Sequence, residues 1–310
     1  MKGPLFYAKI LLFGEYGIIK DSKGLAIPYN SFQGALAKRI GENPTKEATK
    51  SNENLSKLYQ HLTTIDTTIV QFRLKDLKND IDAGMYFDSS IPQGYGVGSS
   101  GAVIAAIYDK YAEDKITVLE NLTRDKLLKL KTIFSEMESF FHGKSSGLDP
   151  LNSYLSLPIL INSKNDLEAT GIPMQQNGKG AVFLLDSNQV GETQPMVEIF
   201  MNKMKKEGFR KMIHEDFTKY TDACISDFLH GNFNALFGNV KSLSKVVLTN
   251  FKPMIPKAFH KLWQQGIETN DYYLKLCGSG GGGYILGFTK DFEKAKKVLN
   301  KYNLELVYSF

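Results

Sequence analysis

Residues 91–102 read IPQGYGVGSSGA, and an apolar run over 102–111 follows them. The segment before them, 85–90, is predicted to be extended, so the pattern predicts a strand, a loop and a helix in succession. Glycine at every second position of the loop lets the backbone adopt positive φ and approach a ligand without a Cβ in the way. The two serines then begin the helix. The stretch therefore predicts a strand, a ligand-binding turn and a helix.

The start of this predicted helix is suited to bind phosphate. Its first N–H groups lack partners within the helix, and the peptide dipoles place positive charge there. A serine hydroxyl can also reach a metal ion. The spacing lacks the extra residue of the dinucleotide fingerprint, and no Gly-Lys-Ser/Thr follows, so neither a Rossmann nor a Walker loop is indicated. The alternative is a glycine-rich turn that only caps the helix through Ser99 or Ser100.

The composition is that of an ordinary globular protein. The 310 residues are 42% hydrophobic and 23% charged, which is enough for two domains with buried cores. The net charge of +5 suits anionic small molecules but is too diffuse to indicate nucleic acid. The two cysteines, Cys224 and Cys277, predict free thiols in a reducing compartment.

A soluble, cytoplasmic location is expected from the apolar segments. The run over 5–13 contains Lys9 and has no small-residue cleavage site after it, which argues against a signal peptide. No other apolar run approaches the length needed to span a bilayer. We therefore expect partners that are small molecules, with neither nucleic acid nor membrane among them. The oligomeric state is left open, a homodimer being one option.

Lys9 is the anomaly of the apolar run over 5–13, which predicts a buried strand that ends at Gly14. A lysine in such a strand costs free energy unless its amine reaches water or meets a carboxylate. Lys9 therefore needs a charged partner or a ligand. The alternative is an edge strand with Lys9 exposed.

A long helix is predicted over 124–141, where apolar residues recur every three or four positions. At about 100° per residue, Glu138 points close to the direction of Leu127 and Phe134, whereas Glu136 points away. Glu138 is thus the carboxylate that faces inward. The next residues form a second small-residue loop that ends in Asp149 before a proline. An Asp-Pro pair that simply initiates a turn is the alternative to a functional acid.

The remaining pattern predicts a mixture of strands and helices. Residues 40–64 are polar and predict a loop or a mobile insertion. Strands are predicted over 67–74, 85–90, 154–162, 181–186, 272–277, 284–289 and 304–310, and helices over 196–206, 213–229, 234–248 and 292–302. The five histidines show no ligand spacing, so a metal hydrolase is not indicated.

Three small-residue loops, each near a charged residue, together resemble the GHMP small-molecule kinases. The sequence YAKILLFGE over 7–15 resembles the first motif of that family, and PQGYGVGSS over 92–100 resembles the second, the nucleotide loop. The sequence KLCGSGGGG over 275–283 resembles the third. Within the family, SGLDP over 146–150 is most similar to mevalonate kinases, and their glutamate eleven residues before the aspartate falls on Glu138. The resemblance covers nearly the whole chain.

The resemblance implies a two-domain α+β GHMP kinase fold. A ribosomal-S5-like N-terminal domain would span 1–188, and a ferredoxin-like C-terminal domain 189–310, with the active site in the cleft between them. It also implies ATP, Mg²⁺ and a small alcohol substrate. Phosphoryl transfer needs mainly positioning and neutralisation of spreading negative charge, which suits a glycine cradle and a metal better than a nucleophile triad.

The resemblance also implies a role for each motif residue. Asp149 would take the proton from the substrate hydroxyl, and Lys9 would lie between Asp149 and the phosphate, where each satisfies the other. Ser100 and Glu138 would hold Mg²⁺. Glu15 and Tyr16 would lie next to the substrate. The nucleotide would be bound by Ser89, Gly94, Tyr95, Gly96, Val97, Gly98, Ser99 and Ser100. The third loop, with Gly278, Gly280, Gly281 and Gly282, would support the second.

A few positions depart from the family pattern and bear on the substrate more than on the kinase assignment. Tyr7-Ala8 replaces the usual Pro-Gly, Tyr16 replaces a histidine, Cys277 a threonine and Gly101 an alanine. The leading hypothesis is ATP-dependent phosphorylation of the 5-hydroxyl of mevalonate, a step of isoprenoid precursor biosynthesis. One alternative is another GHMP kinase that acts on phosphomevalonate or a sugar-like alcohol. The other alternative is a catalytically silent nucleotide-binding regulator. A silent relative would not need all of the catalytic and metal-binding residues, so their retention argues against it; they are Lys9, Ser100, Glu138 and Asp149.

Overall fold

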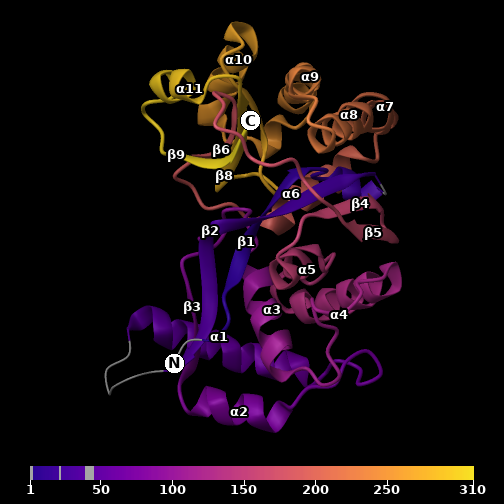
Figure 1. Cartoon of the computed structure of the whole chain (residues 1–310), viewed down its shortest axis with the longest axis vertical. Coiled ribbons are helices and arrows are strands. Elements are labelled where there is room, and N and C mark those ends of the chain that lie inside the picture. The colour runs from indigo at the N-terminus through magenta and orange to yellow at the C-terminus, as the bar shows by residue number, and fades with distance from the viewer. Residues whose placement is uncertain (1–2, 21, 39–44) are drawn as a thin grey trace. The chain divides into compact units, whose positions relative to one another are not determined.

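The computed structural model of the chain describes residues 3–20, 22–38 and 45–310 (Figure 1). Its contacts divide the chain into two compact units. The first unit comprises Met1–Lys9, Pro28–Pro92 and Gly98–Leu157, and the second comprises Ile10–Ile27, Gln93–Val97 and Pro158–Phe310. These units differ from the predicted division at residue 188. The reason is that strands β1 (Phe6–Phe13) and β2 (Gly24–Lys38) each contribute residues to both units.

Among the described residues, the first unit contains the beginning of β1, a short antiparallel strand pair and five helices. The later part of β2 pairs with β3 (Met85–Ser89), from Gly34 opposite Ser89 to Lys38 opposite Met85. The helices are α1 (Lys46–Leu62), α2 (Leu74–Asp82), α3 (Ser99–Tyr111), α4 (Arg124–His142) and α5 (Leu148–Leu155).

Three aromatic side chains hold the helices that carry the candidate site. Tyr108 of α3, Phe134 of α4 and Tyr154 of α5 contact one another edge to face, with ring centroids 5.0–5.6 Å apart. All three are almost completely buried. Such pairs add about 0.5–1.5 kcal/mol each beyond the area they bury. They therefore fix the helix α3 that begins at Ser99 relative to the two helices that carry Glu138 and Asp149.

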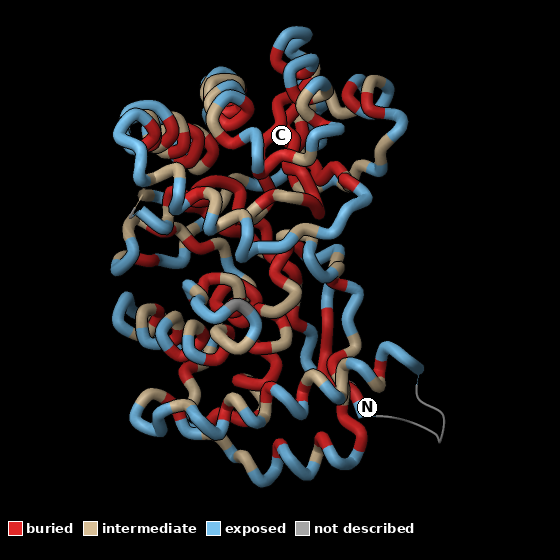
Figure 2. Tube along the Cα trace, turned by 180° about the vertical axis from the view of Figure 1, so that it is seen from behind, coloured by how far each residue is buried: buried red, intermediate tan, exposed pale blue. Residues whose placement is uncertain are grey.

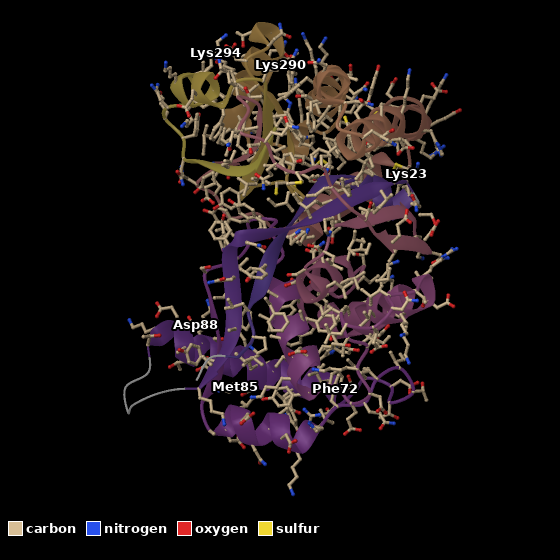
Figure 3. All side chains as sticks on the ribbon, in the orientation of Figure 1. Lys23, Phe72, Met85, Asp88, Lys290 and Lys294 are labelled. Carbon is tan, nitrogen blue, oxygen red and sulfur yellow. The ribbon has the colours of Figure 1, made fainter. Side chains whose placement is uncertain are left out.

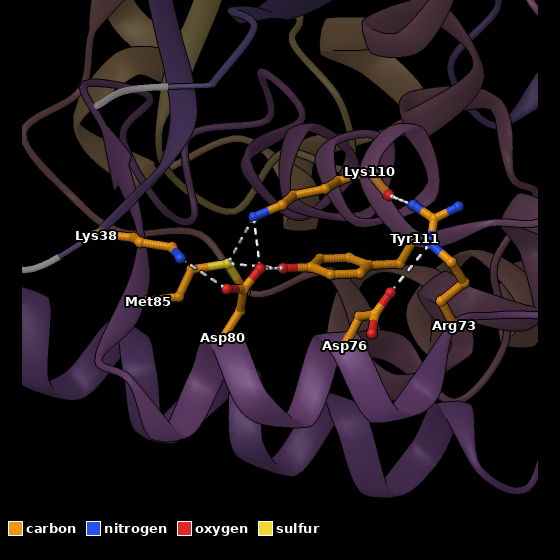
Figure 4. Close-up of polar contacts among 7 residues, drawn as sticks. All are labelled: Lys38, Arg73, Asp76, Asp80, Met85, Lys110 and Tyr111. Atoms are coloured by element: carbon orange, nitrogen blue, oxygen red, sulfur yellow. Dashed lines mark hydrogen bonds and ion pairs between the residues drawn. The ribbon is translucent and has the colours of Figure 1, made fainter.

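A polar cluster joins α2 to the end of α3 (Figure 4). The carboxylate of Asp80 in α2 accepts hydrogen bonds from Lys110 and Tyr111 of α3, both at 2.7 Å, and forms an ion pair with Lys38 at 2.9 Å. Tyr111 Oη also lies 3.1 Å from the sulfur of Met85. One carboxylate thus connects α2, α3 and the β2–β3 pair.

The second unit is built on antiparallel strands covered by helices. Four strands follow the order β7, β8, β6, β9, and the early part of β2 pairs with β4, which pairs with β5. The strands are β4 (Ile159–Ser163), β5 (Asp166–Ala169), β6 (Ala181–Asp186), β7 (Tyr273–Leu276), β8 (Tyr284–Thr289) and β9 (Leu304–Ser309). The main helices are α6 (Thr193–Lys203), α7 (Glu207–Met212), α8 (Thr218–Leu229), α9 (Phe233–Asn250), α10 (His260–Thr269) and α11 (Phe292–Val298).

Burial follows the strands and the inner faces of the helices (Figure 2). Strands β7 and β8 are buried at every position, as expected of strands covered on both faces. The net positive charge stays on the surface, where exposed lysines such as Lys23, Lys290 and Lys294 are found (Figure 3). The mixture of helices with antiparallel strands confirms the predicted α+β class.

Three predicted elements are wrong. Residues 40–64 were expected to form a loop; 40–44 lie outside the described residues, and α1 occupies Lys46–Leu62. Its buried positions Ala48, Leu55, Leu58 and Leu62 recur at helical spacing, a stripe concealed by the polar residues around it. The predicted strand over 67–74 contains only an isolated bridge at Phe72, and α2 begins at Leu74. The predicted strand over 154–162 begins late, because α5 continues to Leu155.

Candidate active site

The glycine loop adopts the backbone that its sequence predicts. Gly94, Gly96 and Gly98 all have positive φ, at 75°, 78° and 80°, and Gly98 caps helix α3 in the left-handed conformation. A Cβ on Gly96 would lie 2.5 Å from the carbonyl oxygen of Cys277, and one on Gly98 would lie 2.9 Å from Cγ of Lys9. Both glycines are therefore required by close approach as well as by φ.

The carbonyl groups of the loop have partners within the second unit, at Gly191 and in the third glycine-rich loop. Gly191 N donates to the carbonyl of residue 94 at 2.9 Å, Tyr284 N donates to that of residue 95 at 3.3 Å, and Cys277 Sγ lies 3.9 Å from that of residue 96. The chain has no cis peptide bond among the described residues. Since the C=O and N–H of a trans peptide point in opposite directions, the N–H groups of residues 95–97 point away from this contact.

These N–H groups are available to a ligand. Among the residues that the structure describes, no hydrogen bond uses the N–H groups of residues 95–97. The next residues in the chain begin α3, whose first N–H groups have no partner within the helix. Buried or half-buried N–H groups in a row, followed by a helix start, are the arrangement that binds an anion.

The third glycine-rich loop, residues 277–284, contacts the first in several places. Gly278 lies next to Gly96, and Gly283 N donates to the carbonyl of Gln189, two residues before the Gly191 that is bonded to Gly94. Gly280, Gly281 and Gly282 also have positive φ and lie against Met254, Met196 and Val190. These glycines are thus held by protein contacts within the second unit.

Lys9 and Asp149 form an ion pair in the first unit. Lys9 Nζ lies 2.8 Å from Asp149 Oδ1, and their side chains are 6% and 37% exposed. Strand β1 does lie at the end of the strand order β1, β2, β4, β5, but Lys9 is not exposed as the edge-strand alternative expected, because its side chain is buried against Gly98. Asp149 lies in the first turn of helix α5 and is half-exposed, so the Asp-Pro pair begins a helix, and the role of Asp149 as a base stays a prediction. The pair thus places a partly exposed carboxylate beside a buried cation.

Glu138 lies beside this pair with its carboxylate buried. Ser100 Oγ donates to Oε1 at 2.9 Å, and Ser145 Oγ donates to Oε2. Burial and the negative charge of Asp149 raise the pKa of Glu138, and the two hydroxyl donors and Lys9 act in the opposite direction. The prediction that Glu138 faces inward is confirmed, since the residue is 3% exposed, and its role toward a metal stays a prediction.

The oxygen atoms around Glu138 fit a hard divalent cation. A carboxylate and a serine hydroxyl are ligands that Mg²⁺ accepts when phosphates and water complete its shell. Within the described residues, no group of three or more His, Cys, Asp or Glu side chains could hold a metal by itself. A cation here would therefore depend on oxygens brought by a ligand.

Glu15 and Tyr16 belong to the second unit, where both side chains are buried. Glu15 accepts a hydrogen bond from Lys275 Nζ, and Tyr16 Oη donates to the carbonyl of Ser279 at 2.6 Å. The Tyr16 ring stacks on Phe200 at 4.7 Å. Burial, assisted by the charge of Glu15, raises the pKa of Tyr16 and keeps it a neutral donor. These contacts connect the first motif to the third, and a substrate-binding role for either residue stays a prediction.

The remaining predicted nucleotide contacts have local partners. Ser89 is exposed, and its Oγ accepts from Ile91 N at 3.0 Å at the start of the loop. The Tyr95 ring meets Tyr284 edge to face at 5.0 Å. Val97 is completely buried, and Ser99 is the first residue of α3. Their roles toward a nucleotide stay predictions.

Two residues of this region were missed by sequence reasoning. Lys275 stands inside the apolar run YLKLC, which is the same signal that singled out Lys9, and its side chain is 3% exposed. Ser145 lies in the small-residue loop before Asp149 but had no distinguishing pattern. Applying the rule for buried lysines to both strands would have found Lys275.

Comparison with known proteins agrees with the fold and the motifs. Residues 65–156 match the family described as GHMP kinases N terminal domain. A search of curated sequences found no match.

Within the described residues, no helix is long and apolar enough to cross a membrane.

Solved structures show the same fold over nearly the whole chain at low sequence identity. L. major mevalonate kinase in complex with R-mevalonate is 16% identical with a TM-score of 0.63, over 97% of this chain and 91% of that one. Streptococcus pneumoniae phosphomevalonate kinase in complex with phosphomevalonate and AMPPNP is 12% identical with a TM-score of 0.60, over 98% of each chain. Lactococcus lactis galactokinase complexed with galactose is 11% identical with a TM-score of 0.60, over 98% of this chain and 92% of that one.

The fold and the glycine loops define a two-domain small-molecule kinase fold, as predicted. Residues 65–156 match the N-terminal domain of the GHMP kinases, and the fold of the chain is similar to that of mevalonate kinases.

Proposed function

We propose that this protein is an ATP-dependent kinase that phosphorylates the 5-hydroxyl of mevalonate, with Asp149 as the base. The observation that carries the proposal is the ion pair between Lys9 and Asp149, which lies in the first unit together with Ser100 and Glu138. A buried cation, an accessible carboxylate and the start of a helix are the parts that phosphoryl transfer to an alcohol requires.

The proposed nucleotide site uses N–H groups that are consecutive in the chain. The N–H groups of residues 95–97 and those at the start of α3 bind the phosphates, whose negative charge the helix dipole favours. Ser100 and Glu138 would hold Mg²⁺, which neutralises phosphate charge when bound. Gly191 holds the carbonyl of residue 94, and the third glycine-rich loop contacts those of residues 95 and 96, so these carbonyls would point away from the phosphates.

In the proposed reaction the substrate oxygen forms a bond to the γ-phosphorus while the bond from that phosphorus to the bridging oxygen of ADP breaks. The hydroxyl proton passes to the accessible carboxylate of Asp149. Lys9 stabilises the negative charge that develops on the substrate oxygen and on the transferred phosphoryl group. The products are the phosphorylated alcohol and ADP, and Asp149 then releases its proton to solvent.

The acceptor is inferred from the similarity of 146–150 to mevalonate kinases and from the fold shared with one that binds R-mevalonate. The alternative acceptors are phosphomevalonate and a sugar-like alcohol, because kinases with the same fold bind phosphomevalonate and galactose. A catalytically silent regulator is disfavoured, since binding alone does not require the Lys9–Asp149 pair.

A coupled ADP-release assay over a panel of alcohols tests the proposal. Mevalonate, phosphomevalonate and galactose are each supplied with ATP and Mg²⁺. We expect turnover with mevalonate and less than a tenth of that rate with the others. Preference for another alcohol would reject mevalonate but keep the kinase, whereas binding of ATP without turnover on any alcohol would support the silent regulator.

A further inference from the structure

Ser145 is the second hydroxyl that holds the buried carboxylate of Glu138. Its Oγ donates to Oε2, while Ser100 donates to Oε1, so each oxygen of the carboxylate has its own donor. The Glu138 side chain is only 3% exposed. With both oxygens bonded, the plane of the carboxylate is fixed before any cation arrives.

Ser145 is itself held in one orientation. Its Oγ accepts a hydrogen bond from Gly147 N at 3.0 Å, so its single proton is left for Glu138. Its carbonyl accepts from Ser135 Oγ at 2.6 Å, and Ser135 lies one turn before Glu138 in α4. The hydroxyl is therefore a directed donor that is anchored to the same helix as the carboxylate it orients.

The loop that carries Ser145 also leads into Asp149. Gly147 caps α5 with φ 71°, and a Cβ there would lie 2.1 Å from the carbonyl of Lys131 in α4. This backbone contact fixes the loop on α4, and Asp149 follows in the first turn of α5. A chain of hydrogen bonds thus runs from Gly147 through Ser145 to Glu138.

We propose that Ser145 is a positioning residue that orients Glu138 for a divalent cation and sets it relative to Asp149. The inference rests on the proposed kinase function. Residues that orient a metal-binding carboxylate through a hydrogen bond change metal affinity when they are removed. Ser145 touches neither substrate nor phosphate in this assignment and acts through Glu138.

The test measures Mn²⁺ binding directly, by the decrease of free Mn²⁺ in electron paramagnetic resonance, on the full chain with a non-hydrolysable ATP analogue. Replacing Ser145 with alanine should weaken Mn²⁺ binding about 10-fold. Ser145→Thr keeps the hydroxyl and should bind within a factor of about 2 of the unmodified chain. Melting curves of each variant establish that it is folded.

Ser139→Ala is the matched control. Ser139 lies next to Glu138 in α4, and its Oγ donates to the carbonyl of Glu136 at 2.7 Å, away from the carboxylate. This variant should bind Mn²⁺ like the unmodified chain. Equal Mn²⁺ affinities for Ser145→Ala and Ser139→Ala would overturn the role of Ser145 and leave the kinase proposal standing. Absence of any Mn²⁺ binding by the unmodified chain with nucleotide would overturn both.

Discussion

Lys9 Nζ contacts Asp149 Oδ1 at 2.8 Å, and the two side chains differ sharply in exposure. The lysine is buried along its length against Gly98, whereas more than a third of the aspartate side chain reaches solvent. The lysine cation is thus held in a fixed position, as expected of an electrostatic stabiliser. The aspartate carboxylate remains accessible, as expected of a base.

Asp149→Asn should lower turnover by about 10²- to 10⁴-fold, because an amide of the same shape cannot accept the substrate proton. ATP binding should stay nearly unchanged, since asparagine keeps the shape of the side chain and the proposed phosphate contacts are backbone N–H groups of the glycine loop. Steady-state kinetics and calorimetric ATP titration measure the two effects. Residual turnover above a tenth of the original rate would show that the base is assigned wrongly.

Gly96→Ala should weaken nucleotide binding at least about 10-fold. The new Cβ would lie 2.5 Å from the Cys277 carbonyl at a φ of 78°, so the loop must move and the N–H groups of residues 95–97 lose their alignment. Gly238→Ala is the control, because this glycine lies in the interior of α9 with no atom within 4 Å of the added Cβ. It should leave nucleotide affinity unchanged and raise stability by up to about 1 kcal/mol.

Lys275→Met should lower the free energy of unfolding by about 3–5 kcal/mol, since it leaves the carboxylate of Glu15 buried without its cation. The double variant Glu15→Gln, Lys275→Met removes both charges and should recover a large part of the loss. Chemical denaturation of the two single variants and the double variant completes the cycle. Additive losses would mean that the two side chains do not interact as the structure shows.

Asp80 should make the chain sensitive to acid. Burial by itself would raise the pKa of Asp80, but hydrogen bonds from Lys110, Tyr111 and Lys38 outweigh burial and hold that pKa below its ordinary value (Figure 4). A lowered folded-state pKa means stability that is present above the unfolded value of about 3.9 and is lost as the pH falls below it. Asp80→Asn should therefore cost about 1–2 kcal/mol at pH 7, and the difference should shrink below pH 4.

Urea denaturation of both proteins from pH 2.5 to 7 measures this difference. The comparison between the two proteins cancels the contributions of the other carboxylates. A gap that stays constant across the range would mean that the cost of Asp80→Asn comes from packing and not from the ion pairs.

Much of the site was predictable because its residues violate local rules. A lysine in an apolar strand, an inward-facing glutamate and alternating glycines each conflict with what a simple strand, helix or turn prefers, and such conflicts concentrate at functional sites. The strand over 181–186 was predicted with its observed bounds, since it is apolar at nearly every position and flanked by turn residues.

The misses have the opposite character. Ser145 is an ordinary loop residue until the fold brings it to Glu138, and no local pattern distinguishes it from Ser146. Helix α1 was missed because its apolar stripe is sparse and its polar majority resembles a loop. The two units are interleaved because β1 and β2 each have residues in both of them. Which residues of a strand contact which unit is decided by tertiary structure, so no local pattern could predict it.

That interleaving decides how the chain can be divided. A fragment of residues 158–310 would contain most of the second unit and would still lack the glycine loop and Glu15, the counter-ion of Lys275. Expressed by itself, this fragment would bury Lys275 without Glu15, and β4 would lack its partner strand β2. Neither unit can therefore be transferred by itself, and engineering by domain exchange has to include strands β1 and β2, which have residues in both units.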